Sequence, residues 1–483
     1  MENRNKIITH LNSKRIEIDG ENAFMPLAYY LRENLCLTGT KVVCAEGDCG
    51  ACTVLLAREI GGDGKPLFKA VNSCIIPLYL VDGAQIVSVE GLKNENGELH
   101  PAQKAMVDCH GAQCGYCTPG FICAMAGLAE KVKNEHGVIT EKKAKNYLTG
   151  NLCRCTGYKP IIEAAVNIDL EKVELLKERF YSPEWLAEMR HIKSTPLVMN
   201  FKEKAIFLPV NLDHALKVKN EYSELKIIAG STDLGVVVNK GKVTTPKAMG
   251  LYHIQELKRI SQDEQFIYVG AMVTLSELED FIESTIPEFK KLLHVFASPQ
   301  IKNQATLVGN VVNGSPIADT IPFLMAADAV VVLKSINGTR EVLMRDFYLG
   351  YKKINIEINE IVVSIKIPKL KKVQKAQLYK VSMRKDLDIS AATFAGIIEI
   401  EQNKIKNACF ALGGVAATVI RLNEIEKMAI GADFSRKTFE ELANKLPEII
   451  SPLSDLRASK EYRMKLVQNY FLKFYDELSK GEI

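Results

Sequence analysis

The stretch CAEGDCGACTV, residues 44–54, places Cys44, Cys49 and Cys52 within nine positions, with only small or acidic residues between them. The chain has twelve cysteines, and all but Cys409 lie between residues 36 and 155. A structural cysteine usually behaves as a small buried hydrophobe, so structural cysteines would be scattered along the chain. The crowding indicates that these sulfurs share a chemical role.

The spacing Cys44-x4-Cys49-x2-Cys52, followed by Cys74, matches the ligand spacing of plant-type [2Fe-2S] ferredoxins. Four thiolates must converge on two irons, so the loop has to curl tightly. Gly47 and Gly50 permit the backbone angles that such a curl needs. A zinc site would more often use CxxC pairs. The first set therefore predicts an iron–sulfur cluster, with buried structural cysteines as the alternative.

A second set follows, with Cys114-x2-Cys117 and then Cys153-x-Cys155. Four cysteines could also hold zinc, and that alternative stays open from spacing alone. A single residue between Cys153 and Cys155 is tight for tetrahedral zinc and suits a binuclear iron cluster. Both pairs lie where we expect helices to end, in GAQCGYCTPG and GNLCRCTG. Two adjacent one-electron centres would indicate electron transfer.

The bulk composition excludes several classes of function. The chain has 483 residues and a formal charge of only +4, so nothing points to nucleic acid as a partner. The first twenty residues lack the apolar core of a signal peptide, and no apolar run reaches the roughly 20 residues that cross a bilayer. We expect a cytoplasmic protein without a membrane partner, in which disulfides are rarely stable.

The pattern of the chain predicts several domains. Short strands, one helix at 25–34 and the first cysteine loop predict a small α+β unit that a last strand closes near residue 92. Helical patterns follow to about residue 166, and 168–204 has the mixed character of a connector. Strands and helices then alternate, including a capped helix after VTLSELED. The last hundred residues alternate strand and turn before helices run to the end.

Two loops of the second half could each bind a diphosphate. IIAGSTDLG (227–235) brings Gly230 and Ser231 to a turn after a strand, and TLVGNVVNGSPIAD (306–319) has a similar small polar lining. Consecutive backbone N–H groups in such turns form anion-binding concavities. Neither loop matches GxGxxG, so a Rossmann fold is not expected. A plain glycine turn between strands is the alternative for each loop.

The segments LTGTKVVCAEGDCGACTV, QCGYCTPGF and LTGNLCRCTGYKPI resemble the paired iron–sulfur domains of the molybdenum hydroxylases. The order of modules is similar to the small, iron–sulfur and FAD-bearing subunits of the xanthine dehydrogenase type. The resemblance implies a multidomain α+β fold. Its parts would be a β-grasp ferredoxin domain (1–92), an all-α four-helix [2Fe-2S] domain (93–167), a linker (168–204), an α/β FAD-binding domain of the vanillyl-alcohol-oxidase type (205–370) and a C-terminal α+β flavoprotein domain (371–483).

The resemblance also implies functional residues. The cluster ligands would be Cys44, Cys49, Cys52 and Cys74, and then Cys114, Cys117, Cys153 and Cys155. Gln113 matches a residue that contacts the pterin of a partner's molybdenum cofactor. The FAD contacts would be Ile227, Ile228, Ala229, Gly230, Ser231, Thr232, Asp233, Leu234, Phe296, Thr306, Gly309, Asn310, Ser315, Asp319, Val362 and Lys380. Animal relatives have two consecutive arginines where this chain has Met383 and Arg384, and Asp386 and Asp388 follow in the same loop.

The function that the resemblance implies is electron transfer. Electrons would pass from molybdopterin on a large partner subunit, through two [2Fe-2S] clusters, to FAD and on to NAD⁺, during oxidation of a purine such as hypoxanthine or xanthine. No catalytic base or nucleophile is expected in this chain, and an oligomer of heterodimers is expected. The alternatives are an aldehyde, nicotinate or carbon monoxide hydroxylase, a standalone NADH diaphorase, and a redox-sensing scaffold.

Overall fold

The computed structural model describes residues 3–384 and 387–480. These residues form two compact units. The first comprises residues up to Val218, Glu224–Gln255 and Ser298–Ala305, and the second comprises Lys219–Ser223, Glu256–Ala297 and the chain from Thr306 onward. In the described ranges, no helix combines the length and the apolar character needed to cross a membrane.

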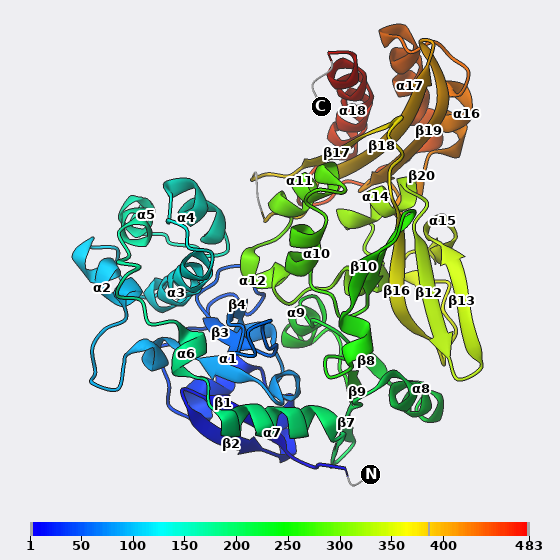
Figure 1. The fold of residues 1–483 in the computed structure, drawn as a ribbon. Coiled ribbons are helices and arrows are strands. Elements are labelled where there is room, and N and C mark those ends of the chain that lie inside the picture. The colour runs from blue at the N-terminus through cyan, green and yellow to red at the C-terminus, as the bar shows by residue number, and fades with distance from the viewer. Residues whose placement is uncertain (1–2, 385–386, 481–483) are drawn as a thin grey trace. The chain divides into compact units, whose positions relative to one another are not determined.

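A five-stranded sheet opens the first unit (Figure 1). The strand order is β2-β1-β5-β3-β4, with β1 parallel to β5 and the other pairs antiparallel. Asn12 and Ser13 have positive φ of 49° and 70°, which suits the two-residue turn between β1 and β2. The strands are β1 Ile7–Leu11, β2 Lys14–Ile18, β3 Thr53–Ala57, β4 Lys69–Asn72 and β5 Gln85–Val87.

One short helix accompanies this sheet, as predicted for residues 25–34. It runs as α1 Leu27–Tyr29 and continues as a π-helical turn, η2 Tyr30–Asn34. The strand predicted toward residue 92 ends at Val87, because the Ser88 amide donates to the Asn12 side chain instead of a neighbouring strand. The 3₁₀ turns of the chain are η1 Gly20–Phe24, η3 Ser73–Ile75, η4 Leu78–Val81, η5 Val89–Leu92 and η6 Gln255–Lys258.

Four helices follow (Figure 1), and they share an apolar core with residues of β3, β4 and β5. The longest helix, α3, buries almost every side chain of its first three turns, including Phe121 and Cys123. Pro is found in the first turn of α2, α3 and α5, where its missing N–H costs no helical hydrogen bond. The helices are α2 Pro101–Asp108, α3 Thr118–Asn134, α4 Glu141–Tyr147 and α5 Lys159–Val166.

His100 caps α2 and makes the stability of this helical region pH-dependent. Its Nδ1 accepts from the Ala102 amide in a capping box with Gln103. Burial, with a smaller effect of the Arg179 charge, lowers the pKa of His100 from 6.5 to about 4. The unfolded chain therefore binds the proton first as pH falls. The contribution of His100 to the free energy of unfolding is fully present above pH 6.5. It decreases toward pH 4, by up to about 3 kcal/mol.

We expect His100→Asn to remove this pH dependence, because Asn also caps helices but does not titrate. The measurement is the free energy of unfolding, followed by helical circular dichroism in urea at pH 5 and pH 7. The variant should lose less stability than the wild type between the two values. His191→Asn, at an exposed position, is the control. An equal loss in all three proteins would contradict the role given to His100.

The stretch 168–204, expected to be a connector, contains two helices and a strand. Ser182 caps α7 by accepting from the Trp185 amide, and Pro183 is in its first turn. The chain then enters a four-stranded sheet of order β6-β7-β9-β8. The elements are α6 Leu176–Arg179, α7 Pro183–Ser194, β6 Leu197–Phe201, β7 Lys204–Leu208, α8 Leu212–Glu221, β8 Lys226–Ile228, α9 Leu234–Asn239, β9 Lys247–Gly250 and α12 Pro299–Lys302.

The second unit begins with an antiparallel sheet of order β10-β11-β16-β12-β13. The predicted capped helix is α10, where Thr274 and Glu277 form a capping box. The strands are β10 Ile260–Gln262, β11 Phe266–Gly270, β12 Val330–Ser335, β13 Gly338–Leu343, β14 Tyr348–Gly350, β15 Lys353–Ile354 and β16 Ile361–Pro368. The helices are α10 Leu275–Phe281, α11 Pro287–Val295, α13 Leu307–Asn313, α14 Thr320–Ala326 and α15 Met344–Phe347.

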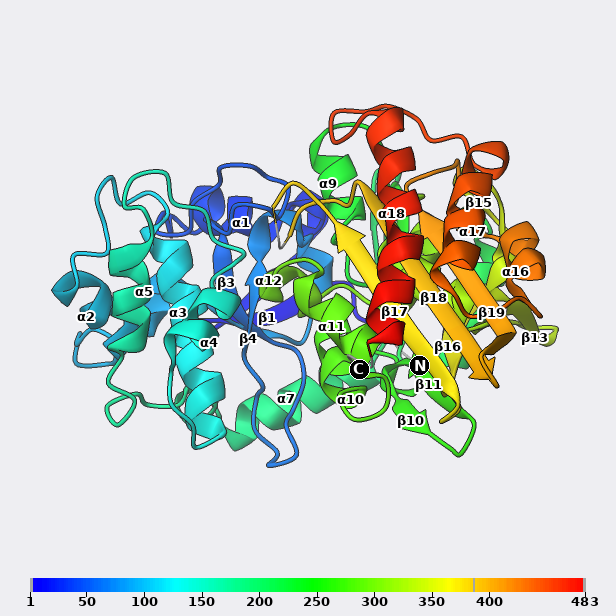
Figure 2. The same cartoon turned by 90° about the horizontal axis from the view of Figure 1, so that it is seen from above.

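The last sheet in the chain is antiparallel, in the order β17-β18-β19-β20, and the long helix α18 packs against it (Figure 2). Phe394 and Phe410 of the sheet pack edge-on or tilted against Phe471 and Phe474 of α18. These rings form an apolar core of their own. The elements are β17 Gln374–Val381, β18 Ala392–Glu401, β19 Lys404–Gly413, β20 Ile420–Arg421, α16 Asn423–Ala429, α17 Arg436–Ile449 and α18 Lys460–Ser479.

Candidate functional site

The first cysteine set converges beside the five-stranded sheet. Cys44 and Cys49 lie in the loop before β3, Cys52 directly precedes that strand, and Cys74 lies in the 3₁₀ turn after β4. Hydrogen bonds join the thiol of Cys44 to those of Cys49 and Cys74, and the thiol of Cys52 to that of Cys74. Cys52 and Cys74 are only 2% and 1% exposed. The structure thus brings all four predicted ligands together around one buried point.

The arrangement of these four thiols indicates which metal group they fit. In a [2Fe-2S] cluster two irons share four thiolates. Within residues 3–384 and 387–480, no three His, Cys, Asp or Glu side chains are placed to hold one metal ion. Four converging thiols are the donor set that a [2Fe-2S] cluster requires. Hydrogen bonds from Cys49, from Cys74 and from the Glu46 amide lower the pKa of the Cys44 thiol, and the same thiol contacts raise the pKa of Cys49 and Cys74.

Neighbouring polar groups fix the shape of this loop. Asn72 Nδ2 donates to the Gly47 carbonyl at 2.6 Å, and Ser73 Oγ donates to the Cys52 carbonyl at 2.6 Å. Asn239, at the end of α9, donates from Nδ2 to the carbonyls of Ala45 and Cys74 at 2.9 and 2.8 Å. Outer contacts of this kind orient the ligands of metal sites. The loop is thus held from its own domain and from α9.

The second cysteine set forms two pairs. Cys114 and Cys155 lie with their sulfurs 3.4 Å apart, and the thiols of Cys117 and Cys153 are hydrogen-bonded. Cys117 is the N-cap of α3, as expected from its place at a helix end, whereas Cys153 and Cys155 lie in the loop between α4 and α5. Burial raises the pKa of Cys117 to about 12. This donor set also fits a binuclear cluster.

The two sets differ in their exposure to solvent. Cys114 and Cys155 are exposed, and so is the neighbouring Gln113, whereas Cys52 and Cys74 are fully buried. The structure therefore brings each predicted ligand set together, and it leaves Cys114 and Cys155 of the second set exposed at the surface, whereas Cys153 is buried. Gln113 lies next to the exposed thiols, where a partner could reach it.

The first of the two predicted flavin loops begins where β8 ends. Gly230 approaches the segment 298–305 so closely that a Cβ would lie 2.1 Å from the Gln304 carbonyl oxygen, and Gln304 donates a hydrogen bond to the Gly230 carbonyl. Ser231 takes a left-handed φ of 61°. The loop then enters α9 at Leu234. The turn is tight and made of small residues, as the predicted anion-binding loop requires.

The second predicted loop surrounds α13. Thr306 caps this helix by accepting from the Gly309 amide at 3.0 Å, and Asn310 Oδ1 accepts from Thr320 at 2.6 Å. Gly314 ends the helix with a left-handed φ of 60°, and Ser315 follows. Among the other predicted contacts, Phe296 is the C-cap of α11, and Val362 lies buried in β16.

Lys380 and Asp319 form a buried ion pair. The Lys380 Nζ lies 2.5 Å from Asp319 Oδ2 and also donates to the Asp388 carbonyl and to Ser390 Oγ. Ser390 in turn donates to Asp319 Oδ1 at 2.5 Å. Both charged side chains are about 95% buried, with 4% and 5% exposed. Two residues that the resemblance implied separately are thus one hydrogen-bonded group.

The loop after Lys380 carries a second ion pair. The Arg384 guanidinium bonds Asp388 and, opposed by partial burial, lowers the pKa of that carboxyl. Met383 is 83% exposed beside it. Asp388 therefore has a definite partner, whereas Asp386 lies outside the described residues.

Breaking the buried pair by Lys380→Met should be strongly destabilising, by about 3–5 kcal/mol, because Asp319 would remain buried without a counter-charge. We expect a lower thermal midpoint and less bound FAD, measured by calorimetry and by the flavin-to-protein ratio. The double variant Lys380→Met/Asp319→Leu should recover stability but not FAD. Lys372→Met, at an exposed position, is the control. Unchanged flavin content in the double variant would argue against a cofactor role.

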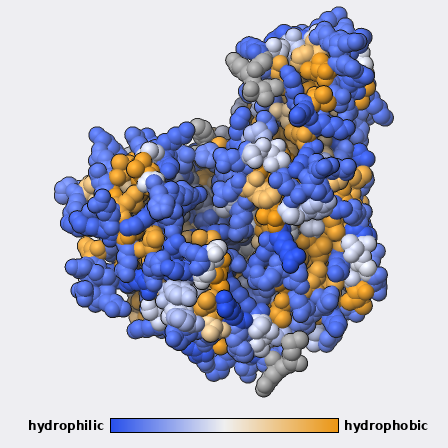
Figure 3. All heavy atoms as spheres, in the orientation of Figure 1, coloured by the Kyte–Doolittle hydropathy of each residue, from blue (hydrophilic) through white to orange (hydrophobic). Residues whose placement is uncertain are grey.

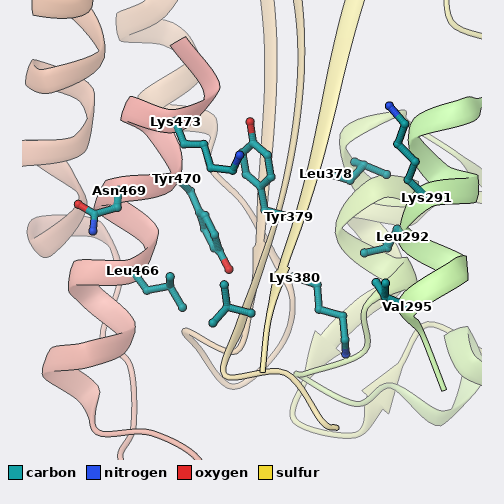
Figure 4. Close-up of a pocket in the computed structure, with 11 residues that line it drawn as sticks. Lys291, Leu292, Val295, Leu378, Tyr379, Lys380, Leu466, Asn469, Tyr470 and Lys473 are labelled. Carbon is teal, nitrogen blue, oxygen red and sulfur yellow. The ribbon is translucent and has the colours of Figure 1, made fainter. Parts of the chain in front are cut away.

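A pocket of about 410 Å³ adjoins Lys380 (Figure 4). It lies between α11, β17 and α18, with Leu292 and Val295 on one side and Leu466 and Tyr470 on the other. Its lining is mostly apolar, and the exposed Lys291 stands at its edge. Val295 lines this pocket, and the next residue in sequence is Phe296, another predicted flavin contact.

Three protein families match consecutive parts of the chain. Residues 88–166 match the [2Fe-2S] binding domain, residues 199–370 the FAD binding domain in molybdopterin dehydrogenase, and residues 377–478 the CO dehydrogenase flavoprotein C-terminal domain. The chain therefore has a [2Fe-2S] binding domain and an FAD-binding domain. Together these domains fit the iron–sulfur and FAD-binding part of a molybdenum hydroxylase.

Individual relatives agree with this family. Xanthine dehydrogenase 2 of Arabidopsis thaliana is 28% identical and the xanthine dehydrogenase of Calliphora vicina 31% identical, each over 97% of this chain but 39% of its own length. The chain thus spans about two fifths of these relatives. Among solved structures, CO dehydrogenase from Oligotropha carboxidovorans is similar over 55% of this chain and 94% of that one, at 25% identity and a TM-score of 0.52. Quinoline 2-oxidoreductase from Pseudomonas putida 86 matches over 57% and 96%, at 23% identity and a TM-score of 0.53.

These matches confirm the predicted fold class, an α+β multidomain chain with iron–sulfur, FAD-binding and C-terminal flavoprotein parts. Sequence reasoning missed the polar residues that hold the predicted cofactor loops, namely Asn72, Asn239, Asn151 and Gln300. A single Asn or Gln carries no local signal of its contact. Asn72 and Asn151 lie two residues before the predicted ligands Cys74 and Cys153, but their contacts are with other segments of the chain.

Proposed function

We propose that the chain is the electron-transfer component of a xanthine dehydrogenase-like molybdenum hydroxylase. In this proposal Cys44, Cys49, Cys52 and Cys74 hold one [2Fe-2S] cluster, and Cys114, Cys117, Cys153 and Cys155 hold the second. Two one-electron clusters and FAD together collect single electrons and release them as a pair. The residues of this chain bind and insulate these groups, and molybdopterin belongs to a partner chain.

The single observation that carries the proposal is the contrast in exposure between the two cysteine sets. The thiolates of an iron–sulfur cluster need protection from solvent and oxidants. Cys114 and Cys155 are exposed, and around them lie the exposed apolar side chains of Tyr116, Leu152 and Tyr158, at 48%, 36% and 38%. Figure 3 shows apolar side chains at the surface over the region that α4 and α5 occupy in Figure 1. Such a surface suits a partner that covers the second cluster and delivers electrons to it.

NAD⁺ is our proposed final acceptor. The pocket beside Lys380 is large enough for part of a dinucleotide, and Lys291 at its edge could pair with a phosphate. The loop with Met383 and Arg384 lies immediately after Lys380. The most similar alternative is a subunit of another molybdenum hydroxylase, which would share the same residues because the substrate pocket would lie on the partner. We further propose a cytoplasmic location and a paired assembly of heterodimers.

The test is purification of the tagged chain from its native host with whatever remains bound. A large molybdenum-containing partner should co-purify, and anaerobic xanthine should bleach the visible absorbance of both flavin and iron–sulfur centres. Bleaching by NADH without a partner would favour the diaphorase alternative. Leu152→Glu should abolish co-purification without loss of iron, whereas Leu456→Glu, at a fully exposed position of the second unit, should not.

A further inference from the structure

Two buried amides connect segment 298–305 to the loop of the second cysteine set, and that loop to the loop of the first set. Gln300 Nε2 donates to Asn151 Oδ1 at 2.7 Å, and Asn151 Nδ2 donates to the Gly50 carbonyl at 3.0 Å. Asn151 is 2% and Gln300 1% exposed. The three residues form an amide relay that runs from α12, through the loop before Cys153, to the loop that carries Cys49 and Cys52. All of them belong to the first unit.

A backbone hydrogen bond beside this relay connects the two predicted ligand sets directly. The Leu152 amide donates to the Cys49 carbonyl at 3.0 Å. Cys49 is a predicted ligand of the first set, and Cys153, of the second set, is the residue after Leu152. The path between their sulfurs therefore consists of covalent bonds and one hydrogen bond, without a gap to cross through space.

The backbones at this crossing approach more closely than side chains would allow. A Cβ at Gly120, in the first turn of α3, would lie 2.2 Å from the Gly50 carbonyl oxygen. A Cβ at Gly150 would lie 2.2 Å from Gln300 Oε1 and 2.6 Å from the Ser298 Cβ. Small residues thus occur where the two loops and α12 meet, as close packing of backbones requires.

Stability does not explain Gln300. Its Oε1 is buried and makes no hydrogen bond within the described part of the chain. Leaving such an atom unsatisfied costs about 1–3 kcal/mol, and replacing Gln300 and Asn151 together by apolar residues of the same shape would avoid that cost. The side chain is nevertheless oriented so that its amide group holds Asn151. This orientation indicates a geometric role in placing the loop before Cys153.

We propose that Asn151 and Gln300 are positioning residues for electron transfer between the two clusters. They fix the hydrogen bond between the Leu152 amide and the Cys49 carbonyl. Along this path one electron leaves the cluster of the second set and enters the cluster of the first. No bond, proton or further reactant is involved. This inference rests on the proposed function, because it requires both clusters.

The test compares Asn151→Asp and Gln300→Glu with wild type in the purified holoprotein. Each variant keeps the shape of the side chain but replaces a donor by an acceptor. In Asn151→Asp the new oxygen faces the Gly50 carbonyl, and in Gln300→Glu it faces Asn151 Oδ1. Asn134→Ala is the matched control, because it removes an Asn-to-carbonyl bond to Glu130 at the far end of α3. The readouts are iron content, the magnetic interaction between the two reduced clusters in electron paramagnetic resonance, and the rate of electron equilibration between them after rapid reduction.

We expect both variants to keep their iron, to show a weaker magnetic interaction, and to equilibrate about tenfold or more slowly, as for other outer-shell changes. The control should match wild type. Unchanged interaction and rate in iron-replete variants would overturn the inference. So would loss of iron from both variants, since the relay would then serve loop assembly. A wild-type protein with only one iron–sulfur signal would instead refute the proposed function itself.

Discussion

Cys74→Ser should remove about half of the iron from the purified protein and leave the other half, because each cluster holds two irons and serine is a poor ligand to them. Cys117→Ser should remove the complementary half. The two losses should be distinct in electron paramagnetic resonance, each variant lacking a different signal of the reduced protein. The combined variant should contain almost no iron.

Two results would contradict this prediction. If zinc, measured by plasma mass spectrometry, disappeared with Cys117→Ser while iron stayed constant, the second set would be a zinc site. If Cys36→Ser lost as much iron as Cys74→Ser, the assignment of the first set would be wrong. Cys36 is exposed, so its replacement should affect neither packing nor metal.

The ease with which the cysteine sets were predicted reflects their local nature. Cys44, Cys49 and Cys52 are close in sequence because one loop must wrap one cluster, so their spacing alone indicates the chemistry. The capped helix α10 is local in the same way, since Thr274 and Glu277 satisfy each other's amides within one turn. The signals for α7 were also present, as Ser182 followed by Pro183, but the mixed charge of 168–204 obscured them.

Contacts between distant segments could not be predicted in this manner. Gln300 and Asn151 are 149 positions apart, and Lys380 and Asp319 are 61 apart. Nothing in the neighbourhood of any of these residues reveals its partner, because the fold brings the segments together. The resemblance named Lys380 and Asp319 as residues of one site, but their ion pair required the structure. Asn151 lies within one of the segments that carry the resemblance, but nothing in that segment indicated its contact with Gln300.

Gly50→Ala should be the most damaging single-methyl change in the chain's first hundred residues. Gly50 has a φ of +67°, which costs a side-chain-bearing residue about 1–2 kcal/mol. Its new Cβ would also lie 2.2 Å from the Gly150 carbonyl oxygen, a backbone atom that cannot rotate away. Overpacking adds about 1–3 kcal/mol, so we expect a total of about 2–5 kcal/mol. Because the overlap separates the loops of both cysteine sets, iron of both clusters should fall together.

Two other glycines separate the effect of the positive φ from the effect of the steric overlap. Gly64 has a φ of +78° with no atom near its would-be Cβ, and Gly62 has open space and no positive φ. Gly64→Ala should therefore lower the thermal midpoint slightly, Gly62→Ala should not, and neither should lose iron. If Gly50→Ala proved no worse than Gly64→Ala, the loops would be free to move apart without consequence. Close contact between the two cysteine loops would then not be required for cluster binding, and the bond between Leu152 and Cys49 could not be a fixed part of the electron path.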